Sequence, residues 1–422
     1  MKSYVGPLAQ AGGDAWTAPV PRASEAALVG GGSWAAIWSL VAVGVLLIAL
    51  IAWLIQRSRG EAPALSVRAQ LRADLLVPIG IQTTLLTYWG LYYGPMAEHA
   101  VMIIASLAFA IGLDLLLRVL TRDEAVLHLA IIPLVLSIHL FVWFEEQHEG
   151  LIFVIVAIAL LSKVFIQRAG RHIFNPSALG IALIGVTCYL APDALRYVDI
   201  AHALNTPPNM FEAILLLGLI AQLRAPIVLV SVSAAVVQYL AIAVTGGEAL
   251  IPSVHWAPVT LAIVLLATDP ATIPRTGLGR VLFGALYAAL MIGLSLLLES
   301  NGISDFFTKV IPIPICNALA PVFDRLHGDV EAAPWSWLNP QHNRAHIGVW
   351  LFVMLAPWFF IGGKANLFEG RFHPLYGTPH IRAQGPVARC EDNPAFCVPF
   401  SFPSEAMLWI DGAPPPVVEE KP

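Results

Sequence analysis

The chain has 422 residues, of which 58% are hydrophobic and only 12% are charged. Soluble domains carry about 25% charged residues, so this composition excludes an ordinary soluble globular protein. The net charge of −5 is small, and the chain has no basic stripe of the kind that binds nucleic acid. We therefore expect a multi-pass protein of a bacterial inner membrane, with lipid as its main surrounding.

Long apolar runs recur along the chain. A helix needs ~20 apolar residues to cross ~30 Å of hydrocarbon, where no water is present to bond the backbone. Continuous apolarity without alternation favours helices over barrel strands. The sequence thus predicts an all-α polytopic helical bundle with ten or eleven transmembrane helices, at 34–55, 75–94, 100–120, 124–144, 150–167, 174–191, 209–223, 225–244, 255–268, 280–299 and 347–363.

The basic residues predict the orientation. With the N-terminus outward, the outward segments hold only a few of the 23 Lys and Arg residues, namely Lys2, Arg22, Arg196, Lys309, Arg325 and Arg344. The positive-inside rule favours this orientation and a cytoplasmic C-terminus. Outside the bundle of residues 34–299 and the last helix at 347–363, we predict an N-terminal segment (1–33), an outward loop (300–346) and a Pro-rich tail (364–422).

Two segments interrupt the apolar pattern in a related way. The first contains Phe174-Asn175-Pro176-Ser177 and the second contains Ala267-Thr268-Asp269-Pro270. Asn and Asp cap helices, and Pro suits the first helical turn. A helix that starts at membrane depth favours anionic groups at its N-terminus. Interruptions at corresponding positions indicate a site in the membrane interior, whereas two ordinary helix ends at the inner surface are the simpler alternative.

The two segments, FNPSALGIALIG and ATDPATIPRTGLGRVLFGALYAAL, resemble the NqrB/RnfD family of membrane subunits. These belong to the sodium-pumping NADH:quinone reductase and to the Rnf electron-transport complex. The matching residues are Phe174, Asn175, Pro176 and Ser177, then Ala267, Thr268, Asp269, Pro270, Gly279, Arg280, Phe283, Gly284 and Ala285. The similarity covers roughly residues 70–300, and it also fits outlying relatives such as the membrane proteins of enediyne clusters.

This resemblance implies two related five-helix halves and a subunit that passes electrons within a larger membrane complex. Flavin or quinone would be the cofactor, and ion movement is an implied coupled activity. It makes Asn175, Pro176, Ser177, Thr268, Asp269 and Arg280 candidate cofactor-binding residues. The resemblance names no catalytic residue.

The family carries a flavin mononucleotide (FMN) esterified to the last Thr of a Ser/Thr-Gly-Ala-Thr motif between the two blocks. The corresponding stretch here is Ala203-Leu204-Asn205-Thr206, which makes Thr206 the candidate attachment point. Leu204 and Asn205 replace the small residues that would open the backbone to the attaching enzyme. These residues argue against covalent FMN at Thr206, and they leave non-covalent FMN and quinone open.

Several other residues carry weaker signals. In the tail, His373, His380, Cys390 and Cys397 offer ligands that suit zinc or iron, although their spacing matches no standard zinc pattern. Asp114 and Arg118 are spaced to pair on one helix face. Gly284, Ala285, Ala288, Ala289 and Gly293 predict a helix-packing face.

Two further classes of function remain open at this point. A transporter or channel that kept the fold without flavin is favoured by the missing Gly-Ala before Thr206. A membrane scaffold for a biosynthetic or photosynthetic assembly is favoured by the long loop and tail, which would serve as docking surfaces.

Overall fold

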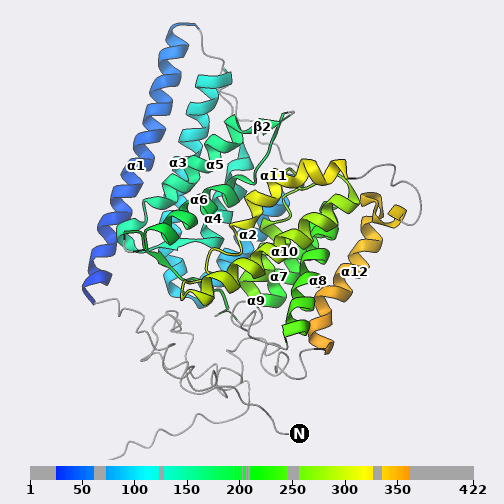
Figure 1. Cartoon of the computed structure of the whole chain (residues 1–422). Helices are drawn as coiled ribbons and strands as arrows, with labels where there is room; N and C mark the ends of the chain where they lie inside the picture. Colours follow the sequence, from blue (N-terminus) through cyan, green and yellow to red (C-terminus); the bar gives the residue numbers. More distant parts are fainter. Residues whose placement is uncertain are drawn as a thin grey trace, which may run out of the picture.

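The computed structural model describes residues 25–60, 73–122, 128–168, 170–192, 194–201, 203–205, 207, 210–245, 256–326 and 335–360. Most of these residues are helical (Figure 1). The helices are α1 (Glu25–Ser58), α2 (Ala73–Tyr92), α3 (Gly94–Arg122), α4 (Ile132–Phe141), α5 (Leu151–Phe165), α6 (Pro176–Leu190), α7 (Met210–Arg224), α8 (Val228–Thr245), α9 (Trp256–Leu261), α10 (Gly277–Ser300), α11 (Pro312–Arg325) and α12 (Asn343–Phe360).

Short elements connect these helices. The 3-10 turns are η2 (Leu129–Ile131), η3 (Glu146–His148), η4 (Ala203–Asn205), η7 (Trp335–Leu338) and η8 (Pro340–His342), and η6 (Ala262–Leu266) is π-helical. Strand β1 (Trp143–Phe144) pairs antiparallel with β4 (Tyr197–Val198), and β2 (Gln167–Arg168) pairs antiparallel with β3 (Arg171–His172). The strands have two residues each, so the prediction of an all-α fold is confirmed for the described residues.

Each predicted transmembrane segment coincides with a helix, but few of these helices are long. By length and composition, four are long and apolar enough to cross a membrane: Leu40–Ser58, Gly94–Thr121, Glu146–Phe165 and Gly277–Ser300. Others are shorter, as the 15 residues of α6 are. Two of the shorter segments adjoin the predicted interruptions: α6 begins directly after Asn175, and η6 ends at Leu266.

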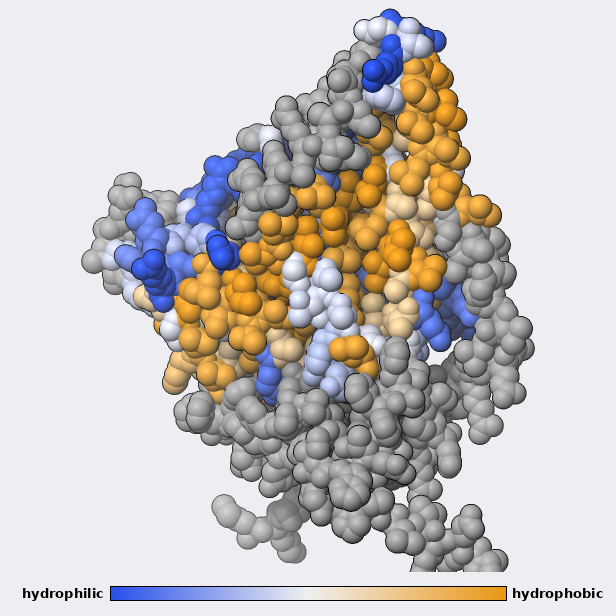
Figure 2. Space-filling view, turned by 180° about the vertical axis from the view of Figure 1, so that it is seen from behind, coloured by the Kyte–Doolittle hydropathy of each residue, from blue (hydrophilic) through white to orange (hydrophobic). Residues whose placement is uncertain are grey.

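The surface of the bundle is apolar and part of its interior is polar. Large apolar side chains are exposed on many helices, including Leu40, Ile104, Leu240 and Phe352, whereas Asn317 is almost fully buried. Figure 2 shows a broad hydrophobic surface that ends at polar residues near the tip of α1 and along the opposite edge. Such a surface fits lipid rather than water, which supports a lipid-embedded protein.

Helix contacts fall into two groups. In the first, α3 packs on α1 and α5, and α6 packs on α4 and α5; in the second, α8 packs on α10 and α12, and α10 packs on α11. The groups meet where α2 contacts α7 and α6 contacts α11. Glycine allows the closest approach within the second group, because a Cβ on Gly284 of α10 would overlap the carbonyl of Val230 in α8. This part of the predicted packing face is confirmed.

The segment predicted as one outward loop, 300–346, instead contains α11. Asp324, at the far end of α11, accepts hydrogen bonds from the N–H groups of Arg275 and Thr276, which precede α10. Asn343, which begins α12, donates to the carbonyl of Gln222 near the end of α7. The chain thus returns along α10 before α12 starts.

This return changes the predicted topology. Arg325 and Arg344 lie on the side of the bundle where α7 ends and α10 begins, and so not on the predicted outward side. In Figure 1 the first residues of α1 and the last residues of α12 both lie at the bottom. The ends of the described chain thus lie on the same side of the bundle, because of the unpredicted α11, and the orientation of the termini across the membrane stays a prediction. The tail at 364–422 lies outside the described residues.

Candidate functional site

The first interruption begins α6 with a capped Asn-Pro pair. Asn175 Oδ1 accepts hydrogen bonds from the N–H of Ala178, at 3.2 Å, and from the hydroxyl of Ser177, at 2.9 Å. Pro176 occupies the first helical position, where no N–H is needed. The predicted helix start at Pro176 is confirmed. Its N-terminus is already occupied by its own side chain, so the predicted preference for an external anion does not fit here.

The second interruption is a turn rather than a helix start. The helix changes from α9 to the π-helical η6, whose last bond runs from Ala267 N–H to Ala262 O at 2.8 Å. Asp269 Oδ1 then accepts from Ala271 N–H at 3.0 Å, which folds Pro270 into a tight turn. Helix α10 begins later, capped by Thr276. The prediction that Pro270 lies beside a helix end is confirmed, because it follows the end of η6, but unlike Pro176 it does not begin a helix.

The two interruptions contact each other directly. Asn175 Nδ2 donates to Leu266 O at 2.9 Å, across 91 positions of sequence. His172 Nε2 lies 3.4 Å from Asp269 Oδ2, and the Arg171 guanidinium donates to Pro270 O at 2.9 Å. The sequence analysis placed these segments in one shared region, and the structure brings them together.

Asn317 of α11 links both interruptions and was missed by the sequence analysis. Its Oδ1 accepts from Asn175 N–H at 2.9 Å, and its Nδ2 donates to Thr272 O at 3.4 Å. The residue is 1% exposed. One polar amide within the apolar stretch Ile313–Ala320 was the available signal, but the segment had been assigned to a loop.

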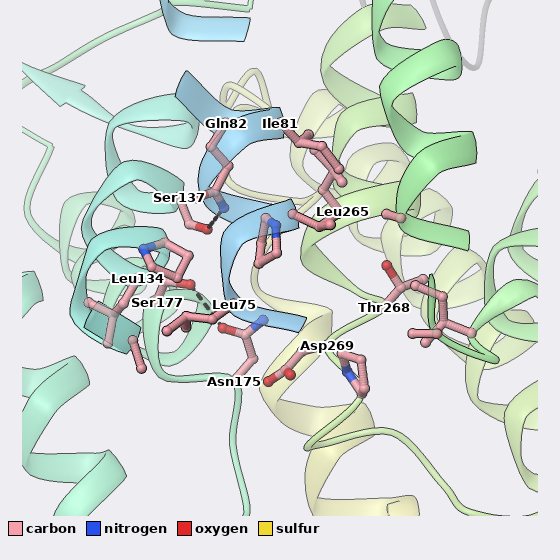
Figure 3. A pocket seen from close by; sticks show the side chains of 18 of the residues that line it. Leu75, Ile81, Gln82, Leu134, Ser137, Asn175, Ser177, Leu265, Thr268 and Asp269 are labelled. Carbon is pink, nitrogen blue, oxygen red and sulfur yellow. Dashed lines mark hydrogen bonds between the residues drawn. The ribbon is translucent and has the colours of Figure 1, made fainter. Parts of the chain in front are cut away.

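A cavity of about 360 Å³ opens between the interruptions (Figure 3). It lies toward one side of the bundle, because its walls come from the start of α2, the ends of α5 and α7, and the start of α6. Apolar side chains such as Leu75, Ile81 and Leu265 line part of it. Polar and charged side chains line the rest: Gln82, Ser137, Lys163, His172, Asn175, Ser177, Arg224, Thr268 and Asp269.

Two acceptor groups in the cavity can form hydrogen bonds with a ligand. Gln82 donates to the Ser137 hydroxyl at 2.7 Å, but its buried Oε1 has no hydrogen-bond partner within the described part of the chain. A buried acceptor without a partner costs about 1–3 kcal/mol, which a ligand donor would recover. Asp269 supplies the second group, a carboxylate that is about one-quarter exposed.

Neighbouring groups stabilise the charged form of the Asp269 carboxylate. Burial by itself raises the pKa of this carboxyl. Hydrogen bonds and charge from His172, together with hydrogen bonds from Ala271 N–H and Thr272, outweigh burial, and the pKa is lowered below its ordinary value. Lys163 and Arg224 add positive charge to the cavity wall. The site therefore combines a carboxylate with several N–H donors.

The other predicted site residues lie elsewhere. Arg280 is outside the cavity lining and donates to the carbonyl oxygens of Pro274 and Pro226. Thr206 lies outside the described residues; the preceding turn is held by the indole of Trp89, which donates to Ala203 O at 2.9 Å. Asp114 and Arg118 form the predicted pair, at 2.7 Å.

The predicted tail metal site cannot be placed on this framework. His373, His380, Cys390 and Cys397 all lie outside the described residues. Among the residues that are described, no group of three or more His, Cys, Asp or Glu side chains is placed to hold a metal ion.

No protein-family model and no curated protein sequence matches this chain. The similarity to NqrB and RnfD therefore rests on the two motifs themselves and stays a prediction.

The cavity suits a neutral ligand better than a free phosphate. Asn175 already caps α6, the helix that begins here, and the carboxylate of Asp269 offsets part of the positive charge of Lys163 and Arg224. A flat ring with hydrogen-bonding oxygens meets donors at Lys163 and His172 and apolar contacts at Leu75 and Leu265. Pockets of this size and mixed lining are typical of small-ligand sites.

Proposed function

We propose that the chain is an integral membrane subunit of an electron-transport complex of the NqrB/RnfD type, with other membrane subunits as partners. We further propose that the cavity between the interruptions binds a quinone head group. One observation carries this proposal: the two motifs that resemble the family, far apart in sequence, line one cavity and are joined by the Asn175–Leu266 hydrogen bond.

The lining can serve both redox forms of such a ligand. The N–H groups of Lys163 and His172 can donate to quinone carbonyl oxygens, while Gln82 Oε1 can accept from a quinol hydroxyl. Reduction of a quinone to a quinol takes two electrons and two protons. The electrons would come from a partner subunit, and the partly exposed His172–Asp269 pair would exchange protons between the cavity and water.

Two finer predictions belong with this proposal. The division of helix contacts into two groups, each with one interruption, supports two related five-helix halves. Non-covalent FMN would need another location, because the cavity does not suit its phosphate. Covalent FMN at Thr206 is testable separately, since a denatured band that fluoresces in ultraviolet light and is lost in Thr206→Ala would establish it.

A transporter is the second candidate, and the broken helices favour it. Carboxylates and free carbonyls at interrupted helices form ion sites in secondary transporters. Here Asp269 lies among the carbonyl groups of Leu266 and Thr272, although both already accept hydrogen bonds from asparagine side chains. Ion coupling and electron transport are compatible in one subunit.

Anaerobic titration of the purified protein with a short-chain benzoquinol, whose hydroxyl groups can donate to Gln82 Oε1 and to the Asp269 carboxylate, tests the proposal. We expect saturable binding that Gln82→Leu and Asp269→Asn each weaken about fivefold to tenfold, the value of one hydrogen bond. Glu299→Gln, which alters an exposed carboxylate at the far end of α10, is the matched control and should bind like the native protein. Absent quinol binding, together with sodium uptake by proteoliposomes that Asp269→Asn abolishes, would establish the transporter instead.

A further inference from the structure

A second cavity lies away from the candidate site, between α8, α10 and α12. It has a volume of about 370 Å³. Its walls are almost entirely apolar and include Leu229, Val232 and Val236 of α8, Val281 of α10 and Val349 of α12. Figure 1 shows α12 on the outside of the bundle beside α8, and the lining residue Val236 is 37% exposed, so the groove opens to the surroundings of the protein. We call it the α8–α12 groove.

Basic side chains gather at one end of the α8–α12 groove. Arg280 lies in the first turn of α10, and its guanidinium donates to Pro226 O. This bond places Arg280 beside the end of α7, where Arg224 lies. Arg344 follows Asn343, whose side chain donates to Gln222 O at 3.0 Å. These three arginines come from separate helices, and the return of the chain through α11 is what brings Arg344 to the other two.

The same end carries the features of a membrane–water boundary. Trp337 lines the groove and is 46% exposed, and Trp is the residue that favours this boundary. Its carbonyl accepts a hydrogen bond from the buried His346 at 2.8 Å, which fixes the turn against α12. Asp324 lies near Arg280 and offsets part of its charge, but this carboxylate faces three arginines. The end of the groove is therefore basic.

The size and lining of the groove suit a flexible apolar chain. Its volume is about 370 Å³, and a partner helix could insert only side chains into that space. An apolar chain that ends beside three arginines requires an anionic head group.

We propose that the α8–α12 groove binds one acyl chain of an anionic membrane phospholipid, whose phosphate is held by Arg224, Arg280 and Arg344. Basic pockets between helices bind anionic lipid head groups by this combination of charge and apolar contact. The apolar groove shares no lining residue with the cavity at Asn175 and Asp269, although Arg224 also lines that cavity, so Arg344→Gln tests the lipid site without altering the other one.

Native mass spectrometry of the detergent-purified protein tests this site. Phosphatidylglycerol and phosphatidylcholine with the same acyl chains are added separately, and the apparent dissociation constants are compared. We expect one phosphatidylglycerol to bind more tightly than phosphatidylcholine. Neutralising one arginine should weaken the binding of phosphatidylglycerol about fivefold. We therefore expect Arg344→Gln to raise its dissociation constant about fivefold, and the double variant with Arg224→Gln about 25-fold.

Two controls separate this site from general surface effects. Arg196→Gln removes an exposed arginine outside the groove, and it should leave lipid binding unchanged. Val236→Trp fills the groove and should weaken the binding of both lipids, whereas Leu183→Trp on the exposed face of α6 should weaken the binding of neither. Equal affinity for the two lipids, an equal effect of Arg196→Gln, or unchanged binding in Val236→Trp would each overturn the proposal. Displacement of the lipid by a second copy of the protein would also overturn the proposal.

Discussion

The two cavities of this protein have nearly the same volume and opposite linings. The cavity between the interruptions, about 360 Å³, carries amide, hydroxyl, basic and carboxylate side chains, whereas the α8–α12 groove, about 370 Å³, is almost wholly apolar. The first forms where helices stop, and the second forms where complete helices run past one another. Helix ends leave backbone groups without partners, and polar side chains gather there to satisfy them.

This difference explains why one cavity suits chemistry and the other suits lipid. Asn175, Asn317 and Asp269 serve mainly as partners for free backbone groups, and the same placement exposes Gln82 and His172 to a ligand. In the α8–α12 groove the backbone bonds are internal to the helices, so nothing polar is needed within it. The contact between the two interruptions therefore depends on a few side chains.

The largest expected effect comes from Asn175→Ala. The variant loses the cap of α6 and the bond to Leu266 O, and it leaves that carbonyl buried. The cap is worth about 0.5–2 kcal/mol and the unsatisfied group about 1–3 kcal/mol, so we expect a loss of about 2–4 kcal/mol. Thermal unfolding of the protein in detergent measures it.

The matched control for this change is a second Asn-Pro cap. Asn339 precedes Pro340 and accepts from Gln341 N–H at 2.9 Å, but within the described residues its side chain bonds no other segment, and it is only half-buried. Asn339→Ala should cost about 1 kcal/mol or less. Equal losses in the two variants would show that the contact between the interruptions adds nothing to stability.

A smaller effect is expected at the packing face beside the α8–α12 groove. A Cβ on Gly284 would overlap the carbonyl of Val230, whereas a Cβ on Gly293 meets no atom within 4 Å. Gly284→Ala should destabilise the protein by about 1–3 kcal/mol through overpacking. Gly293→Ala should stabilise it by about 0.5–1 kcal/mol, the usual gain when Gly is replaced within a helix. Chemical denaturation of both variants measures the difference, and losses of equal size would refute the close approach of α8 and α10.

The sequence predicted those parts of the structure that depend on local pattern. Continuous apolar runs predicted the helices, and the Asn175-Pro176 pair predicted the start of α6. Helix α11 was not predicted, because Pro312, Pro314 and Pro321 are typical of a loop. That omission also placed Arg344 on the wrong side.

Long-range packing decided the rest. No local signal places Lys163, His172 and Gln82 in one cavity with Asp269, because α2, the end of α5 and the turn after η6 meet only in three dimensions. Asp269-Pro270 reads as a helix start, but the side chain of Asp269 bonds Ala271 N–H and makes a turn. The α8–α12 groove gave no signal, since its valines resemble those of any lipid-facing helix.

The smallest expected effect concerns pH and tests the carboxylate that distinguishes the first cavity. Because neighbouring donors lower the folded-state pKa of Asp269, its charge stabilises the fold above the unfolded-state pKa of about 3.9, and this contribution is lost as the pH falls through the lower folded-state value. A partly exposed pair such as His172–Asp269 contributes up to about 1 kcal/mol. Asp269→Asn should therefore lower the melting temperature slightly at pH 6 and reduce the further loss between pH 5 and 3, as followed by thermal unfolding. An acid profile of Asp269→Asn identical to that of the native protein would show that its neighbours do not hold this charge, and the contrast between the two cavities would then rest on hydrogen bonding alone.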